Sequence, residues 1–230
     1  MRDSVHRLIP HNVDKTVSQE PMTTSQGQIE KLVADAKTGS EEALAELYGH
    51  YKQHLRRIIS FRLDDRLKGR IDPSDVLQEA YIDLAKRLPE FGKKDGMSFF
   101  VWLRLVTHER LLGFHRQHLN TQKRDARREI RMHQNATGVS SVFLAAHLLG
   151  RHTSVVGGAI RAEQKAQLEA VLETMDEVDR EVIALRIFEG LTNGEAAEVL
   201  DLTKQTTSKR FIRAIGRLRE ILDSIPGFGT

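Results

Sequence analysis

The apolar residues of this 230-residue chain recur at steps of three and four positions, and this spacing constrains the fold more than any other feature. The segment from Leu44 to Ile59 shows it best, because its apolar side chains fall on one face of a single helix. These residues are Leu44, Leu47, Tyr48, Tyr51, Leu55, Ile58 and Ile59. No stretch alternates apolar and polar residues at every second position, as a half-buried strand would. The pattern predicts an all-α protein.

Composition indicates the class of protein, but net charge does not show whether the protein binds nucleic acid. Hydrophobic residues make up 40% of the chain and charged residues 29%, a balance typical of a globular protein. The formal net charge is only +3, so the distribution of basic residues must decide whether nucleic acid is bound. The absence of cysteine excludes disulfides and thiolate chemistry. We see no signal peptide and no apolar run near the roughly 18 residues of a membrane span, so we expect a cytoplasmic protein.

Breaks in the helical pattern divide the chain into four segments. Residues 1–28 are polar and aperiodic, and we expect a mobile N-terminal extension. Residues 29–119 carry helical periodicity and predict a first helical domain. Residues 120–161 have one short apolar run, VFLAAHLL, among Gly, Ser, Thr and basic residues. The whole segment is too long for a connection inside one compact domain, so we expect a long flexible linker. Residues 162–226 regain the periodicity and predict a second helical domain.

Two short helical patterns separated by a tight turn occupy the segment from Glu189 to Leu222. Thr192 can cap the first helix with Glu195 as its capping-box partner, and Thr203 can cap the second. One face of the second helix is apolar, with Phe211, Ile215, Leu218 and Leu222. In a helix-turn-helix, the N-terminal part of the second helix enters the major groove of DNA.

The other face of that second helix is polar and basic. Its candidate DNA-binding residues are Thr203, Lys204, Gln205, Thr207, Ser208, Lys209, Arg213 and Arg217. Gln and Lys side chains can bond base edges, and Ser and Thr can bond base edges or phosphate. The alternative is the solvated face of a packed helix, which also carries Lys and Arg. The two caps and the tight turn together favour DNA binding.

Neither enzymatic catalysis nor metal binding is supported by the sequence. Carboxylates on the helix that Asp72 can cap could act as general acid and base, but no nucleophile or phosphate loop accompanies them. His108, His115 and His118 could ligate a metal, but no cysteine or nearby carboxylate set completes a site. We therefore expect no enzyme, no metal and no cofactor.

Three motifs in order resemble the sigma-70 family of transcription initiation factors. The segment DREVIALRIFEGLTNGEAAEVLDLTKQTTSKRFIRAIGRLRE is similar to the fourth conserved region, with Asp201 where Gly is common. DPSDVLQEAYIDLAKRLPEF resembles the polymerase-binding helix of the second region, and FFVWLRLVTHERLLGFHRQHL resembles the promoter-melting helix. Two such domains with little else resemble the extracytoplasmic-function (ECF) group, and HRQHLNTQKRDARREI is similar to a variant common in planctomycete members.

The resemblance implies a role for the outer face of the helix that begins near Asp72. Its candidate polymerase-binding residues are Asp75, Gln78, Glu79 and Asp83. In the family this helix meets the clamp-helix coiled coil of the largest subunit of core RNA polymerase. Carboxylates can pair there with arginines of the partner. A solvated face is the alternative.

The resemblance also implies that the melting helix and the loop before it open the −10 element of promoter DNA. The candidates are Lys93, Lys94, Met97, Arg104, Thr107, His108, Arg110, His115 and Arg116, all expected to be exposed. Basic side chains and a pocket can offset the cost of unstacking a base. Phe99, Trp102, Leu103 and Val106 are expected to be core instead.

The expected function is that of a sigma factor, which binds core RNA polymerase and promoter DNA, reading the −35 element as duplex and opening the −10 element. Many family members are held by an anti-sigma protein, and the sequence leaves open whether this chain has such a partner. The alternative function is an ordinary helix-turn-helix regulator whose N-terminal half senses a ligand or dimerises.

Overall fold

The computed structural model describes residues 25–64, 66–92, 96–119, 139–151 and 158–225. These residues form nine α-helices and no strand, and the single β-bridge among them joins Lys68 and Ile71. The prediction of an all-α protein is confirmed. Backbone contacts divide the described chain into two compact units, residues 25–119 and residues 139–225.

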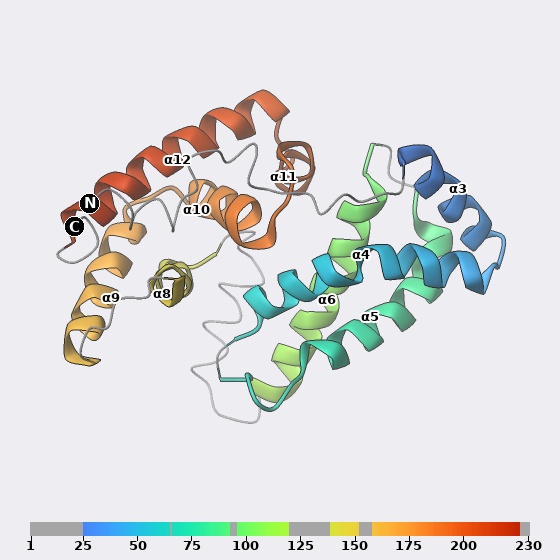
Figure 1. Cartoon of the computed structure of the whole chain (residues 1–230), viewed down its shortest axis with the longest axis horizontal. Helices are drawn as coiled ribbons and strands as arrows, with labels where there is room; N and C mark the ends of the chain where they lie inside the picture. The colour runs from blue at the N-terminus through green and yellow to red at the C-terminus, as the bar shows by residue number, and fades with distance from the viewer. Residues whose placement is uncertain (1–24, 65, 93–95, 120–138, 152–157, 226–230) are drawn as a thin grey trace. The chain divides into compact units, whose positions relative to one another are not determined.

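Four α-helices and a short 3₁₀ turn make up the N-terminal unit. They are α3 (Gln26–Lys37), α4 (Glu41–Arg62), α5 (Pro73–Arg87), the 3₁₀ turn η1 (Leu88–Glu90) and α6 (Phe99–Leu119). Helix α3 packs on α4, while α5 packs on both α4 and α6 (Figure 1). All seven apolar residues that the sequence placed on one face of α4 are buried in this core.

Local capping chemistry fixes where these helices begin. The Ser40 hydroxyl accepts a hydrogen bond from the Ala43 amide at 3.1 Å at the start of α4. The Asp72 carboxylate accepts one from the Ser74 amide at 2.7 Å, and Pro73 takes the first position of α5. This backbone hydrogen bond lowers the pKa of Asp72, because it favours the charged carboxylate. The predicted start of this helix is confirmed.

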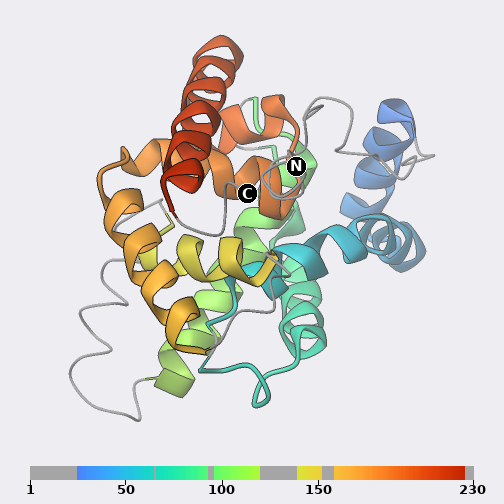
Figure 2. The same cartoon turned by 60° about the vertical axis from the view of Figure 1, so that its left-hand side comes forward.

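The C-terminal unit contains five α-helices and a π-helical turn. They are α8 (Ser141–Arg151), α9 (Gly158–Glu173), α10 (Glu177–Ile183), the π turn η2 (Ala184–Glu189), α11 (Asn193–Leu200) and α12 (Lys204–Ser224). Helix α12 packs along α10, α11 and α9, and α8 lies beside α9 (Figures 1 and 2).

Helix α8 lies inside the range that was predicted from the sequence as linker, and this part of that prediction is wrong. Leu144, Ala145, Leu148 and Leu149 are buried, so the short apolar run packs into the C-terminal unit. The amide of Val139, just before the helix, donates to the Glu181 carboxylate at 2.8 Å. A segment with a buried apolar face and a satisfied backbone belongs to the unit that covers it. Residues 120–138 and 152–157 lie outside the described residues.

The π turn lets the chain pass from α10 into the helix-turn-helix segment. Gly190 ends the turn with φ 78°, a left-handed conformation that glycine adopts without steric cost. Arg186 within the turn is buried, and its Nη1 donates to the Leu191 carbonyl at 2.5 Å. Its guanidinium also lies 5.4 Å from the centre of the Phe211 ring of α12. The turn therefore ties the start of the α11 segment to the inner face of α12.

Candidate nucleic-acid interface

Helices α11 and α12 form a helix-turn-helix whose ends are closed by local hydrogen bonds. The Thr192 hydroxyl accepts from the Glu195 amide at 3.2 Å, and the Glu195 carboxylate accepts from the Thr192 amide at 2.7 Å. The Thr203 hydroxyl accepts from the Thr206 amide at 3.1 Å and starts α12. All three capping roles that the sequence predicted are confirmed.

The turn between the two helices depends on one residue in a left-handed conformation. Asp201 has φ 53° and ψ 45°, and the next amide, that of Leu202, donates back to the Ala197 carbonyl at 2.9 Å. The Asn193 side chain donates to the Lys204 carbonyl at 2.8 Å, which joins the first turns of the two helices directly. Buried Ala196 and Ala197 leave room for α12 to approach. The relative position of the two helices is therefore fixed by side chain, backbone and packing.

Most of the predicted DNA-binding residues of α12 lie on its outer side. Thr203, Lys204, Gln205, Lys209, Arg213 and Arg217 are exposed, and Ser208 is half-buried. Thr207 is buried, and its hydroxyl donates to the Thr203 carbonyl at 3.1 Å, so its predicted exposure is wrong. The reason is helical geometry: Thr207 lies one turn before Phe211, on the face that packs into the unit.

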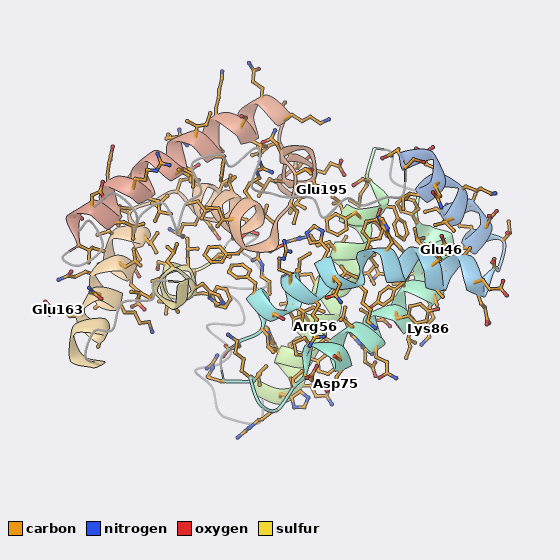
Figure 3. The ribbon with its side chains drawn as sticks, viewed as in Figure 1. Glu46, Arg56, Asp75, Lys86, Glu163 and Glu195 are labelled. Atoms are coloured by element: carbon orange, nitrogen blue, oxygen red, sulfur yellow. The ribbon has the colours of Figure 1, made fainter. Side chains whose placement is uncertain are left out.

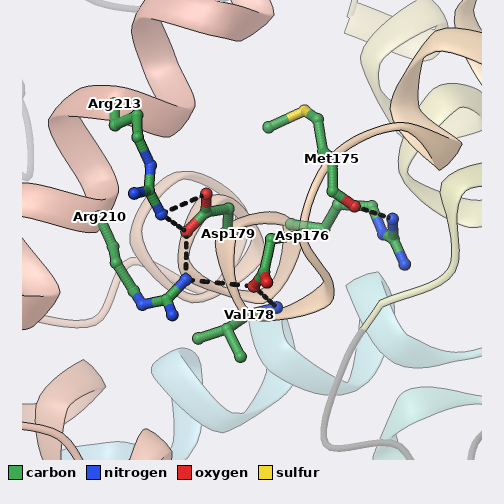
Figure 4. A network of polar contacts seen from close by, with 7 residues as sticks. Met175, Asp176, Val178, Asp179, Arg210 and Arg213 are labelled. Carbon is green, nitrogen blue, oxygen red and sulfur yellow. Dashed lines mark hydrogen bonds and ion pairs between the residues drawn. The ribbon is translucent and has the colours of Figure 1, made fainter.

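Three arginines on the side of α12 are bonded to α10 and to the residues just before it. Arg210 donates to Asp176 at 3.1 Å and to Asp179 at 2.7 Å, and Arg213 donates to both oxygens of Asp179 at 2.9 and 3.1 Å (Figure 4). Arg217 donates to the Thr174 hydroxyl at 3.0 Å. The hydrogen bond to Asp179 raises the pKa of Arg210.

The sequence did not point to Arg210, Asp176 or Asp179. The only indication that it carries is the spacing of Arg210, Arg213 and Arg217, which places three cations on one side of a helix. That spacing does not reveal a partner more than thirty positions away. Arg213 and Arg217 are thus exposed, as expected, but each is already bonded within the unit.

In the N-terminal unit, the predicted carboxylate face of α5 is divided between solvent and α6. Asp75 and Gln78 are exposed, and Asp75 and Lys86 lie toward opposite ends of the helix (Figure 3). Glu79 is half-buried and pairs with Arg110 of α6. Asp83 lies 3.6 Å from the same guanidinium. Asp75 and Gln78 therefore remain available on the outer side.

The same ion pairs change the expectation for α6. Arg110 is half-buried against the two carboxylates of α5, so its expected exposure is wrong. One turn away along the interface, Arg87 of α5 pairs with Glu109 of α6 at 2.5 Å. These pairs join residues 22 and 31 positions apart, and helical periodicity carries no information on such contacts.

Burial removes three further residues from the predicted melting surface. Arg104, Thr107 and His115 are buried, and the expectation that they are exposed is wrong. The Thr107 hydroxyl donates to the Leu103 carbonyl at 2.9 Å, and His115 accepts from the Asp64 amide at 3.4 Å. The physical reason is that α6 packs against both α4 and α5, so more than one of its faces is covered.

The remaining members of that set lie at the surface or outside the described residues. Arg116 is exposed, as expected, whereas His108 and Met97 are half-buried, so the expected exposure of His108 is wrong in the same way as that of Arg110. Lys93 and Lys94 fall outside the described residues. The four residues predicted as core are all buried: Phe99, Trp102, Leu103 and Val106.

Neither a metal site nor a membrane span is found in the described parts of the chain. Within those ranges, no three His, Asp or Glu side chains gather as a group able to hold a metal ion. His115 is buried, whereas His118 is exposed and its ring stacks 6.1 Å from that of Phe114. None of the helices that the structure describes is long and apolar enough to cross a membrane.

An all-helical chain of two units, one of them with a capped helix-turn-helix and a basic outer helix, defines a helical DNA-binding protein. The family model described as ECF sigma factor matches residues 26–222, so the chain belongs to the ECF sigma factors. It therefore binds core RNA polymerase and directs transcription initiation, as a non-catalytic subunit. This membership decides against both the ordinary helix-turn-helix regulator and the enzyme.

The chain is similar to two mycobacterial sigma factors over most of their length. The chain is 23% identical over 209 residues to the ECF RNA polymerase sigma factor SigD of Mycobacterium tuberculosis (strain ATCC 25618 / H37Rv), covering 89% of each chain. It is 24% identical over 183 residues to the ECF RNA polymerase sigma factor SigK of the same strain, covering 80% of this chain and 87% of the relative. A solved structure of CnrH in complex with the cytosolic domain of CnrY aligns with TM-score 0.46 and 22% identity, covering 84% of this chain and 96% of that chain.

Proposed function

We propose that the C-terminal unit of this sigma factor recognises the −35 promoter element as duplex DNA through the first turns of α12. The observation that carries this proposal is the capped helix-turn-helix with Lys204, Gln205 and Lys209 exposed at the start of α12. In this arrangement the N-terminal residues of the second helix contact base edges in the major groove. Ser208, half-buried on the same side, would contact a base or a phosphate.

The N-terminal unit is proposed to bind core RNA polymerase through the outer side of α5. Asp75 and Gln78 are the contact residues in this proposal, because both are exposed. Glu79 and Asp83 would act at the edge of the same surface, where Arg110 holds them against α6. Asp75 accepts a hydrogen bond from the Asp72 amide at 3.3 Å but pairs with no arginine among the described residues. A carboxylate that is already paired with an arginine gains less from a second one, so Asp75 is expected to dominate.

The same unit is proposed to open the −10 element with the surface around the start and outer side of α6. The residues that support this role are the exposed Arg116 and the half-buried Met97 and His108, together with Lys93 and Lys94, which precede them in the sequence. Replacement of His108 and Arg116 by alanine should weaken permanganate reactivity of unpaired thymines near the start site. Unchanged reactivity would assign strand opening to other residues.

The finer assignments of organisation and lineage are proposals as well. The extension predicted over residues 1–28 is proposed to end before Ser25, which caps α3. The two domains are proposed to be joined by a linker confined to the part between α6 and Val139, since α8 packs with α9. Similarity of the segment His115–Ile130 to a variant of planctomycete members supports that lineage. The cytoplasm, where RNA polymerase acts, is the proposed compartment, and an anti-sigma protein is a proposed partner by family membership.

The experiment that tests the function combines the full chain with core RNA polymerase and maps the 5′ ends of the transcripts. Starts at a defined set of sites, each with a shared element about 35 base pairs upstream, are expected. The double variant Asp75→Asn with Gln78→Arg should lose polymerase in a pull-down while folding normally, since both side chains are exposed. Glu46→Arg, a charge change at an exposed position of α4, is the control and should retain polymerase. Equal pull-down by both proteins would refute the α5 surface.

A further inference from the structure

Asp179 is a nearly buried carboxylate that lies between two arginines of α12. Its side chain is only 9% exposed and lies 2.7 Å from Arg210 and 2.9 Å from Arg213. Arg210 is in turn held by Asp176, whose carboxylate also accepts from the Val178 amide at 2.9 Å and caps α10. Asp179 is therefore itself fixed by its neighbours, so it can fix a second side chain.

Only one nitrogen of the Arg213 guanidinium is bonded to Asp179. Both of its hydrogen bonds to Asp179 come from Nη2, and its side chain is 64% exposed (Figure 4). Among the described residues, its Nε–H and Nη1–H groups have no partner. A guanidinium presents its donors in a fixed planar fork, so anchoring one nitrogen also fixes the direction of the others.

We propose that Asp179 is a positioning residue for DNA binding, which orients the guanidinium of Arg213 so that its free Nη1–H donors meet a backbone phosphate. This inference rests on the proposed function, in which the outer side of α12 faces promoter DNA. The exposed residues Gln205, Lys209 and Arg213 follow each other at steps of four positions, so Arg213 continues the same side of the helix. Arg–phosphate hydrogen bonds are charge-assisted, and a donor whose direction is already set forms one at a lower cost in side-chain ordering.

Orientation and charge predict opposite effects for Asp179, which makes the proposal decidable. The four groups Asp176, Asp179, Arg210 and Arg213 carry two negative and two positive charges, so removing the charge of Asp179 leaves one net positive charge near DNA. If the carboxylate acted only by neutralising the arginines, its removal would strengthen binding to polyanionic DNA. If it orients Arg213, its removal weakens binding, because the free arginine must then be ordered upon each association.

The test measures binding of the full chain to a 20-base-pair duplex of random sequence by fluorescence anisotropy at several salt concentrations. Asp179→Asn is compared with Asp176→Asn, a matched control: it makes the same charge change, retains a capping side chain and does not touch Arg213. Asp179→Asn should bind about 2- to 10-fold more weakly than Asp176→Asn. In the background of Arg213→Ala, which should lower the salt slope by about 0.9, Asp179→Asn should bind no more weakly than Asp176→Asn.

Several results would overturn the proposal. Equal or tighter binding by Asp179→Asn would show that the carboxylate only neutralises, and equal weakening with and without Arg213 would show a purely structural role. If Asp179→Asn does not fold, Arg213→Lys decides, because Arg213 is mostly exposed: it keeps the charge but loses the fork, so it should weaken binding at an unchanged salt slope. Binding of Arg213→Lys or Arg213→Ala like the wild type would refute the proposal, whereas the recognition helix itself fails only if Lys209→Ala is also without effect.

Discussion

The position of each side chain along α12 predicts whether it discriminates between bases or only holds the DNA backbone. A helix rises about 1.5 Å per residue, and the major groove is about 12 Å wide. Lys209 lies four positions beyond Gln205, about 6 Å along the axis, and both can occupy the groove together. Arg217 lies twelve positions beyond Gln205, about 18 Å along the axis, so it lies past the groove wall when Gln205 contacts a base.

These distances give two different expected losses. Gln205→Ala or Lys209→Ala should reduce discrimination by about 1–3 kcal/mol at one or two base pairs of the −35 element and leave the others unchanged. Arg217→Ala should weaken binding to all sequences alike and lower the salt slope by at most about 0.9. The reduction should be smaller than that limit if the hydrogen bond to Thr174 persists in the complex.

The assay is binding of the full chain, assembled with core RNA polymerase, to a library of −35 variants at two salt concentrations. Each variant gives a preference at every position and a salt slope. The exposed Glu220, near the C-terminal end of α12, supplies a control, since Glu220→Ala should leave the preference at every position unchanged. Uniform weakening by Gln205→Ala, Lys209→Ala and Arg217→Ala would refute the geometric reasoning and reduce α12 to a phosphate contact.

Three further predictions concern the stability of the fold. Leu148→Ala should lower the free energy of unfolding by about 2–5 kcal/mol in urea titration, whereas Val142→Ala, 49% exposed on the same helix, should cost less than about 0.5; similar small losses would place α8 outside the cooperative unit. Arg180→Met removes donors to three backbone carbonyls and should cost about 2–4 kcal/mol by the same measurement, and a loss below about 1 kcal/mol would mean that water replaces them. The hydrogen bond from Arg66 lowers the pKa of Asp64, so this group stabilises the fold above its unfolded pKa of about 4 and the stabilisation is lost as pH falls further; Asp64→Asn should flatten that acid limb, and an unchanged limb would contradict the assignment.

Predictions from the sequence succeeded where the determining interactions are local. Thr192, Glu195 and Thr203 form the caps expected of them, because each partner lies three positions away. The buried face of α4 also follows from sequence, since helical periodicity alone decides which side chains share a side. The all-α class and the helix-turn-helix are consequences of such local patterns.

Tertiary packing decided which polar side chains remain at the surface. Arg104, Thr107 and His115 share α6 with apolar residues, and only the covering of that helix by both α4 and α5 buries them. The apolar run of α8 was too short to reveal its partner, because a periodic face shows that a helix packs but not where. The sequence alone thus could not separate this part of the C-terminal unit from the linker.

Long-range ion pairs were the second feature that only the tertiary structure decided. Arg110 pairs with Glu79, which lies 31 positions away in the sequence, and Arg210 pairs with Asp179 at the same separation. A charged residue in a sequence shows only that a partner, a ligand or water must satisfy it, since Coulomb attraction depends on distance in space. The amino-acid sequence therefore determined the helices, their caps and the helix-turn-helix, whereas packing determined which arginines are held by a carboxylate and in which direction their remaining donors point.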